Sequence, residues 1–428
     1  MRRVVAIIDG EHYPPVVRDA LAELDDVVVA AVLVGGTEKL RDDVAGYGVA
    51  LEPTVEEAIE RHQPDAVLDL SDEPVLGPRE RFALAGRVLA LGLPYEGPDF
   101  RFEPPAMTPV GLPTLSVIGT GKRVGKTAVT GHVARHLATG RRVVVVAMGR
   151  GGPAEPEAVV VPPTVESLLA LSRDGRHAAS DHLETALVAG VPTVGCRRCG
   201  GGLAGAVASS NVIEGVTLAR TLEPELLVLD GSGAAQPPVD AGARLLVVSA
   251  AQPVEVTSGY LNTYRARIAD LVLVTMAEDD APHDALVAAL RPHVRPGTTV
   301  IRSVLRPRPL EPLEGERVAY FCTAPVTQHQ RLAAHLANAY GAHTTAVSGV
   351  LADRELLRAD LERIDADTFL VELKAAAVDV VVEEASRRGV RVVVAANDIV
   401  PLPREPAFEA AIDRLADEAI ARTPEAVS

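Results

Sequence analysis

Short apolar runs alternate along this 428-residue chain with longer stretches in which apolar residues recur every three or four positions. In the first hundred residues this pattern predicts strands and helices in turn, at Val4–Ile8, Val16–Leu24, Val27–Val34, Val55–Arg61, Ala66–Leu70 and Arg79–Leu91. Such alternation is typical of a parallel sheet with helices on its faces. We therefore expect an α/β unit over residues 1–105.

The alternation continues beyond two proline-rich stretches, at residues 98–113 and 306–312, where we expect connectors. Between them the pattern predicts strands at Leu115–Ile118, Val143–Ala147, Leu226–Leu229, Leu245–Val248 and Leu271–Thr275. After them it predicts strands at Arg317–Cys322, Thr344–Val347, Phe369–Leu373 and Val390–Ala395, and helices at Leu332–Tyr340, Arg354–Ile364, Ala376–Arg387 and Phe408–Ile420. The expected domains are residues 1–105, 111–306 and 313–428.

A glycine-rich turn separates the apolar run Leu115–Ile118 from a helical pattern that begins near Ala128. The turn reads Gly119-Thr120-Gly121-Lys122-Arg123-Val124-Gly125-Lys126-Thr127. This arrangement is typical of a phosphate-binding loop, in which backbone N–H groups and the helix dipole attract the anion. We expect residues 119–128 to bind ATP, with Lys126 on the β- and γ-phosphates and Thr127 on Mg²⁺. The predicted fold is α/β, a central P-loop NTPase domain with a mostly parallel sheet, flanked by a Rossmann-like N-terminal unit and a C-terminal α/β unit.

The loop departs from the pattern G-x-x-x-x-G-K-[ST], because Thr120 stands where the first glycine is expected. The form G-T-x-x-x-V-G-K-T resembles the loop of dethiobiotin synthetase and related P-loop ATPases and ligases. Relatives with an extra signature lysine carry it five places before the loop lysine, a place that Gly121 occupies here. We therefore expect Lys122 to contact the transferred or accepting phosphate. The alternative to a phosphate-binding loop is a Gly-Lys-Thr sequence that occurs in a turn by chance.

Asp230 follows the apolar run Leu226–Leu229 and precedes a glycine-containing turn. A carboxylate at the end of a buried strand beside a P-loop would hold Mg²⁺ directly or through water, since triphosphate chemistry needs a metal ion. The alternative is an aspartate that caps a turn. We expect Asp230 and Thr127 as metal ligands, with Glu155 as a further candidate.

Two stretches combine arginine with glycine, Met148–Pro153 and Cys196–Gly202. Arginine pairs with two phosphate oxygens at once, and glycine lets the backbone approach an anion. We expect a phosphorylated substrate to be bound by Arg150, Arg197, Arg198, Gly200 and Gly201, with Arg150, Lys122, Lys126 and Asp230 in the catalytic set. The alternatives are a solvated arginine in a flexible turn and a metal or redox role for Cys196 and Cys199. A zinc site would need two further ligands from Cys322, His177 and His182.

Further polar residues are candidates for the substrate site. His182 lies near Asp181 and Glu184 in the sequence and would contact phosphate or act as an acid or base, although a lone histidine is as readily structural. Asp9, Glu11 and His12 follow the first predicted strand, and ligands of α/β sheets bind at that end of the strands. The alternative for these three is a polar turn before the next helix.

The composition narrows the class of protein. Net charge is −16, which argues against a broad nucleic-acid surface. We find no run of about 20 apolar residues and no apolar stretch at the start long enough for a signal peptide. Three cysteines cannot form a disulfide framework. These features predict a cytoplasmic protein without nucleic-acid or membrane partners. Lysine is used only at positions 39, 122, 126 and 374, and two of these lie in the loop.

In order along the chain, Ile8–Pro14, Gly119–Thr127, Met148–Pro153, Cys196–Gly202 and Leu229–Gly233 resemble the cyclic 2,3-diphosphoglycerate synthetase family over nearly the whole length. The first and fourth of these stretches carry the likeness. It implies cyclisation of 2,3-bisphosphoglycerate with ATP and Mg²⁺, forming an intramolecular phosphoanhydride and releasing ADP and phosphate, and a homodimer is possible. The alternatives are another ATP-dependent ligase or kinase of the dethiobiotin-synthetase type and a nucleotide-switched P-loop ATPase.

Overall fold

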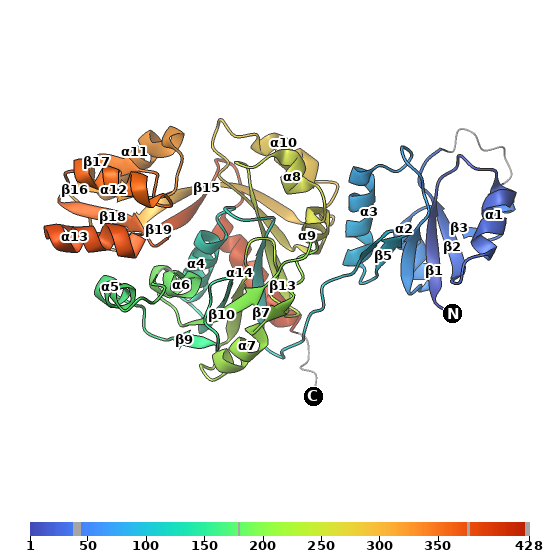
Figure 1. The fold of residues 1–428 in the computed structure, drawn as a ribbon, viewed down its shortest axis with the longest axis horizontal. Helices are drawn as coiled ribbons and strands as arrows, with labels where there is room; N and C mark the ends of the chain where they lie inside the picture. Colours follow the sequence, from blue (N-terminus) through green and yellow to red (C-terminus); the bar gives the residue numbers. More distant parts are fainter. Residues whose placement is uncertain (37–43, 179, 375–376, 424–428) are drawn as a thin grey trace.

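A computed structural model describes residues 1–36, 44–178, 180–374 and 377–423, which form two separate β-sheets (Figure 1). The first sheet has the order β3-β2-β1-β4-β5-β6, from β1 (Arg3–Ile8), β2 (Val27–Leu33), β3 (Ala50–Leu51), β4 (Ala66–Asp69), β5 (Tyr95–Gly97) and β6 (Phe100–Phe102). Its pairs are parallel except β5 with β6. Its helices are α1 (Pro14–Ala22), α2 (Val55–His62) and α3 (Pro78–Ala90), with a 3-10 turn, η2 (Val44–Tyr47).

The second sheet has thirteen strands and begins with the phosphate-loop region. Its order starts β11-β10-β8-β12-β7-β13-β14, with β9 beside β10. The strands are β7 (Thr114–Gly119), β8 (Val143–Gly149), β9 (Glu157–Val159), β10 (Thr193–Cys199), β11 (Ser209–Ser210), β12 (Leu226–Asp230), β13 (Ala243–Ser249) and β14 (Leu271–Thr275). The neighbouring strands β10, β8, β12, β7, β13 and β14 run parallel to one another, so their carboxyl ends meet at one edge of the sheet.

Helices cover both faces of this central sheet. On one face, apolar residues of α4 (Lys126–Leu137) and α14 (Phe408–Ala421) pack against β7, β8, β12 and β13. On the other face, the sheet packs against α7 (Val212–Arg220), α9 (Asn262–Ile268) and α10 (His283–Leu290). The remaining helices of this part are α5 (Val165–Arg173), α6 (Asp181–Ala189) and α8 (Val254–Ser258). Apolar clusters on both faces therefore hold the strands whose ends carry the candidate site.

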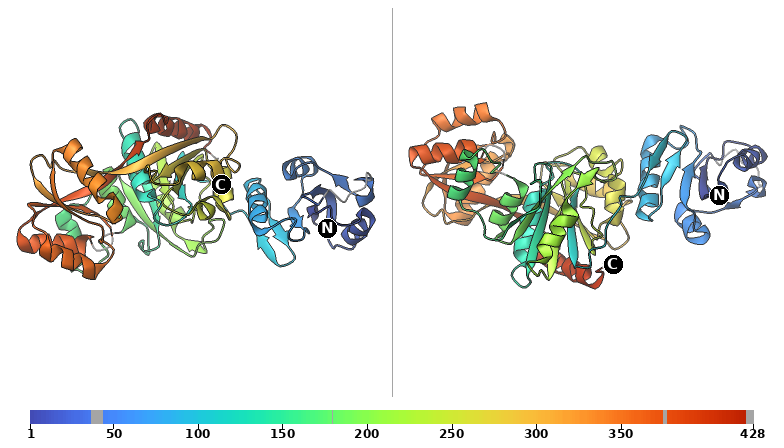
Figure 2. Two further views of the ribbon diagram at one scale, coloured as in Figure 1. Left: turned by 90° about the horizontal axis from the view of Figure 1, so that it is seen from above. Right: turned by 60° about the horizontal axis from the view of Figure 1, so that its bottom comes forward.

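The same sheet continues into the C-terminal part through β15 (Thr299–Pro309), which pairs parallel with β14 and antiparallel with β19 (Arg391–Pro401). Beyond it lie β18 (Thr368–Glu372), β16 (Arg317–Phe321) and β17 (His343–Ser348). The accompanying elements are η3 (Val326–Gln328), α11 (His329–Tyr340), α12 (Arg354–Arg363), the π-helical turn η4 (Ala377–Val382) and α13 (Glu383–Arg388). Figures 1 and 2 show the N-terminal unit set to one side of the two parts that share this sheet.

The expectation of a connector at residues 306–312 was wrong for residues 306–309, which belong to β15. Pro307 and Pro309 fit this strand because β15 pairs only with β19 there. The Leu310 N–H bonds the Val394 carbonyl at 2.9 Å, so alternate residues face β19 and the two prolines direct their missing N–H groups to the open edge. The division into three domains stays a prediction, and α14 returns from the C-terminal segment to the central core.

The predicted helix at Ala376–Arg387 begins in residues 375–376, which lie outside the described part of the chain. From Ala377 on, the structure has a π-helical turn followed by α13. Among the described residues, no helix combines the length and apolar character needed to span a lipid bilayer.

Candidate functional site

The phosphate-binding loop joins β7 to α4, as the glycine pattern predicts. Gly125 caps α4 in the left-handed region, with φ of 83°, where a side chain would be strained. Neighbouring strands fix the rest of the loop. The Thr120 N–H bonds the Val247 carbonyl at 3.2 Å, and the Thr275 hydroxyl donates to the Val124 carbonyl at 2.8 Å. The loop is therefore held in shape by β13 and β14.

Lys126 and Asp230 meet although they lie 104 residues apart. Their strands are neighbours, since Asp230 of β12 pairs with Val117 of β7. The Lys126 ammonium lies 3.3 Å from the Asp230 carboxylate and also donates to the Gly231 carbonyl. The Thr130 hydroxyl donates to the same carboxylate oxygen at 3.0 Å. The structure thus brings together the two residues that the sequence analysis paired through P-loop chemistry.

Burial sets the electrostatics of this pair. Asp230 is 3% exposed and Lys126 is 8% exposed. Burial raises the pKa of the Asp230 carboxyl, and the nearby Lys126 opposes that shift. The Thr120 hydroxyl is buried in the loop without a hydrogen-bond partner among the described residues. An unpaired hydroxyl and an ammonium at the start of a helix fit a triphosphate, and the oxygens of Thr127 and Asp230 are the ligand type that Mg²⁺ takes.

Arg198 lies beside the phosphate loop. Its guanidinium donates to the Ser232 carbonyl at 2.8 Å and to the Gly200 carbonyl, so part of it holds the turn after Asp230. A Cβ on Gly233 would lie 3.5 Å from the Lys122 side chain and 3.7 Å from the Arg198 guanidinium. Burial lowers the pKa of Arg198, and the charge of Arg150 acts in the same direction. Lys122, Arg150 and Arg198 therefore gather positive charge at one place.

The neighbouring residues of β10 serve different ends. The Arg197 side chain is exposed, and its backbone N–H bonds the Asn211 side chain at 2.7 Å. Cys196 is buried against α7, where a Cβ on Gly215 would lie 2.1 Å from its sulfur, and burial raises its pKa to about 12. Cys199 is exposed. Within the described residues no metal-binding cluster includes a cysteine, so the Cys-x-x-Cys pair has no zinc site there.

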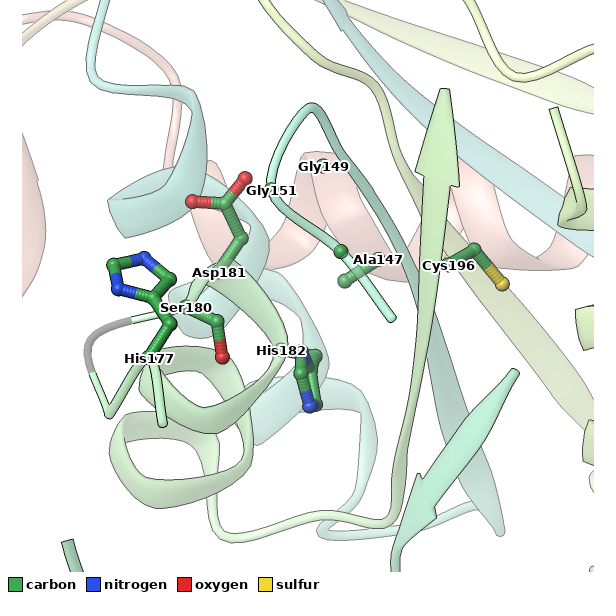
Figure 3. Close-up of a pocket in the computed structure, with 9 residues that line it drawn as sticks. Ala147, Gly149, Gly151, His177, Ser180, Asp181, His182 and Cys196 are labelled. Atoms are coloured by element: carbon green, nitrogen blue, oxygen red, sulfur yellow. The ribbon is translucent and has the colours of Figure 1, made fainter. Parts of the chain in front are cut away.

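A small cavity of about 50 Å³ lies between the Gly149–Gly152 turn and the start of α6 (Figure 3). His182 lines it and packs against Gly195, where a Cβ would come 2.6 Å from the imidazole ring. Burial lowers the pKa of His182, so the ring is neutral near pH 7. Gly149 and Gly151, which line the cavity, are the sequence neighbours of Arg150. The structure therefore brings Arg150 and His182 to the same region.

Three site residues escaped the sequence analysis as functional candidates: Asp181, Glu184 and Lys374. Asp181 begins α6, and its charge acts on the pKa values of Asp230, Arg198 and Lys374. The Lys374 ammonium, from the turn after β18, lies 3.9 Å from the Glu184 carboxylate. Burial raises the pKa of Glu184 to about 8. The rarity of lysine was the one sequence signal that pointed to Lys374.

Other predicted residues lie elsewhere. Asp9 accepts hydrogen bonds from the Glu11 and Asp72 N–H groups at 3.1 Å each. The His12 imidazole lies 3.9 Å from Asp9 and 3.8 Å from Asp72. These residues follow β1 and β4 of the N-terminal sheet. Glu155 is exposed, and within the described residues no hydrogen bond or ion pair links it to Asp230.

Comparisons with known proteins cover the whole site. Models of the N-terminal, P-loop and C-terminal domains of cyclic 2,3-diphosphoglycerate synthetase match residues 3–103, 114–304 and 309–398. The synthetase of Rubrobacter xylanophilus is 49% identical over 92% of this chain and 94% of the relative. That of Thermococcus sibiricus is 39% identical over 96% and 97%.

A solved structure, LpxK from Aquifex aeolicus in complex with ATP, aligns over 73% of this chain and 91% of that chain, with 15% identity and a TM-score of 0.44. The three domain models match this chain in the order N-terminal, P-loop and C-terminal. The relatives are similar over nearly their whole length, and the phosphate-binding loop lies within the matched P-loop domain. The chain belongs to the cyclic 2,3-diphosphoglycerate synthetase family.

Proposed function

We propose that this protein is an ATP-dependent ligase that closes 2,3-bisphosphoglycerate into cyclic 2,3-diphosphoglycerate, with release of ADP and phosphate. The observation that carries the proposal is the meeting of two halves at one sheet edge. Lys126 of the phosphate-binding loop pairs with Asp230 at the end of β12, and Lys122 and Arg198 flank Gly233 next to them. The membership of the family, argued above, supports the choice of substrate.

The substrate explains the basic cluster. Two phosphates and a carboxylate carry about four or five negative charges near neutral pH. A protein with a net charge of −16 must therefore concentrate positive charge locally. Arg150, Arg197, Arg198, Gly200 and Gly201 would bind this polyanion, with His182 beside them. We keep Asp9, Glu11 and His12 in the substrate set as a proposal that depends on how the N-terminal unit meets the substrate.

The reaction would proceed in two phosphoryl-transfer steps. In the first, an oxygen of one substrate phosphate attacks the γ-phosphorus of ATP and ADP leaves, which creates a diphosphate on the substrate. In the second, the other substrate phosphate attacks the inner phosphorus of that diphosphate, the ring closes and inorganic phosphate leaves. Lys126 and the loop N–H groups would hold the β- and γ-phosphates, and Lys122 and Arg150 would stabilise charge on the transferred group.

Thr127 and Asp230 would hold Mg²⁺, with Glu155 as a further candidate ligand. Their side chains offer the hard oxygen ligands that this ion prefers. Bound there, Mg²⁺ would neutralise charge on the phosphates. The buried Asp230 carboxylate is kept in place by Lys126 and Thr130, so the protein supplies a fixed ligand rather than a mobile one.

The test is incubation of the full-length protein with ATP, Mg²⁺ and 2,3-bisphosphoglycerate, followed by ³¹P NMR. The expected result is a pair of mutually coupled diphosphate signals together with equimolar ADP and inorganic phosphate. ATP hydrolysis without those coupled signals would refute ring closure. It would favour another ATP-dependent ligase or kinase reaction of the dethiobiotin-synthetase type instead.

A further inference from the structure

The start of α6 lacks the side-chain cap that its sequence offers. Ser180 occupies the N-cap position with extended backbone, φ −78° and ψ 149°, yet its side chain makes no capping hydrogen bond. The N–H groups of the first helical turn have no partner within the helix, and serine at this position ordinarily accepts one of them. Within the described part of the chain, the N–H groups of Asp181, His182 and Leu183 therefore have no hydrogen-bond partner.

The Ser180 hydroxyl is also buried and unpaired. The residue is 6% exposed, and among the described residues its Oγ has no hydrogen-bond partner. An unpaired buried hydroxyl costs free energy, so such a group needs a reason to remain. Ser180 lines the cavity of about 50 Å³ described above, together with His177, Asp181 and His182 (Figure 3).

The opposite wall of this cavity is built from glycines. A Cβ on Gly152 would lie 2.0 Å from the Cys196 carbonyl, and one on Gly149 would lie 3.0 Å from the Asp181 carboxylate. Larger residues would thus not allow this turn to close over the cavity. Glycine N–H groups, a helix N-terminus and a hydroxyl are the donors from which oxyanion sites in proteins are made.

The acidic group of the lining, the Asp181 carboxylate, lies at the Gly149 end of the cavity. Figure 3 shows the Asp181 carboxylate pointing away from the Ser180 hydroxyl and the His182 ring. The charge of this carboxylate acts to raise the pKa values of Arg198 and Lys374. The cavity holds roughly three to five water-sized groups, at about 10–15 Å³ each, which matches a carboxylate or a phosphate group.

We propose that Ser180 and the N-terminus of α6 form an oxyanion subsite that takes one carboxylate or phosphate group of the polyanionic substrate. This subsite rests on the proposed function for the identity of the substrate. The Ser180 hydroxyl donates to the anion, and the first-turn N–H groups of α6 complete the contact. Occupation of the cavity by the anion accounts for the hydroxyl that the protein leaves unpaired.

The test compares Ser180→Ala with wild type. Loss of a hydrogen bond to a charged group raises the KM for 2,3-bisphosphoglycerate about tenfold or more, while the KM for ATP is unchanged. The melting temperature stays the same or rises, because the hydroxyl bonds no protein group. Thr164→Ala is the matched control: Thr164 does cap α5, bonding the Ser167 N–H at 3.2 Å. It lowers the melting temperature by about 1–2 °C and leaves both KM values unchanged.

A carboxylate-free analogue identifies the group that is bound. Glycerol 1,2-bisphosphate is tested as a competitive inhibitor of wild type and Ser180→Ala. Equal inhibition constants assign the subsite to the carboxylate, and a tenfold weaker inhibition of the variant assigns it to a phosphate. An unchanged KM for 2,3-bisphosphoglycerate in Ser180→Ala overturns the subsite and leaves the hydroxyl to an ordered water.

Direct binding separates this subsite from the proposed reaction. Titration calorimetry with 2,3-bisphosphoglycerate needs no turnover. If wild type makes no cyclic product but Ser180→Ala binds the bisphosphate about tenfold more weakly than wild type, only the reaction is refuted. If wild type does not bind the bisphosphate at all, the subsite and the proposed function both fail.

Discussion

The nucleotide half and the acceptor half of the candidate site differ in how their polar groups are paired. In the nucleotide half, Lys126, Asp230, Thr130 and Thr275 all bond protein atoms. In the acceptor half, the Arg197 side chain is exposed, and the buried Ser180 hydroxyl has no hydrogen-bond partner within the described residues. Most polar groups of the nucleotide half are thus bonded within the protein, with the Thr120 hydroxyl as the exception, whereas the acceptor half combines a paired Arg198 with an unpaired Ser180 hydroxyl.

This contrast suggests a division of labour. Paired, buried groups keep a fixed geometry, which favours the positioning of a transferred phosphoryl group. Groups without protein partners lose little when they bind an anion, because no internal bond has to break first. Substitutions in the nucleotide half should therefore stop turnover, and substitutions in the acceptor half should weaken the second substrate.

The largest effect is expected for Lys126→Ala. It removes the ammonium that we propose contacts the β- and γ-phosphates, so ADP formation should fall by about 10³-fold or more. The residual rate is measured by coupled ADP release at saturating ATP. Lys126→Arg tests the shape of the cation, and it should also be inactive because a planar guanidinium does not replace a compact ammonium. Turnover by Lys126→Ala above a tenth of the wild-type rate would break the assignment of the nucleotide half.

Arg197→Ala should act on the other substrate. Loss of one arginine–phosphate contact should raise the KM for 2,3-bisphosphoglycerate about 10- to 100-fold, with the KM for ATP unchanged. Steady-state kinetics with each substrate varied in turn measures both constants. Arg173→Ala removes an exposed arginine that pairs with Glu383 on the surface, and it should change neither constant. A rise in the KM for ATP instead would show that the two halves are not separate.

Glu184 links stability to pH, because burial raises its pKa from 4.5 to about 8. Between these values the unfolded chain releases the proton that the native state keeps. Wild-type stability should therefore fall as pH rises from 4.5 to 8. Glu184→Gln removes that fall, so its stability relative to wild type should increase by on the order of 1–3 kcal/mol between pH 5 and pH 8.

Urea denaturation of both proteins at pH 5 and pH 8 measures this difference. Glu60→Gln, at an exposed glutamate of α2, controls for the loss of a surface carboxylate. If Glu184→Gln and wild type differ by the same free energy of unfolding at pH 5 and pH 8, Glu184 is ionised in the native state.

The smallest effect is expected for His12→Ala. The imidazole is more than half exposed and lies at 3.8–3.9 Å from Asp9 and Asp72, so its contact with a substrate would be weak. The KM for 2,3-bisphosphoglycerate should rise by less than about fivefold, as expected for an exposed charged contact. Kinetics at low ionic strength gives the best resolution. No change at all would remove the N-terminal group from the substrate site.

Local patterns allowed the nucleotide half to be predicted. The strand, glycine turn and helix around Lys126 are contiguous, and Asp230 follows a run of four apolar residues that predicts a buried strand. The strands and helices of both sheets were also found in most cases because alternation is a local signal. β10 was not predicted as a strand, although it positions Arg197 and Arg198.

The acceptor half depends on tertiary contacts that no local pattern contains. Lys374 reaches Glu184 only because β15 and β19 join the C-terminal strands to the central sheet. No sequence pattern singled out Ser180, and only the structure shows that it stands at the N-cap of α6 without a side-chain capping bond. The prolines at 307 and 309 suggested a connector because proline cannot donate a hydrogen bond to a neighbouring strand. They are tolerated in β15 because no strand within the described residues pairs with them on that side, which only the structure shows.

Equilibrium binding of both ligands to two variants tests the division of labour most directly. Calorimetry with a non-hydrolysable ATP analogue and with 2,3-bisphosphoglycerate is carried out on Lys126→Ala and Arg197→Ala. The account predicts a crossed result: Lys126→Ala loses the nucleotide and keeps the bisphosphate, and Arg197→Ala keeps the nucleotide and binds the bisphosphate at least tenfold more weakly. Equal weakening of both ligands in either variant would contradict it.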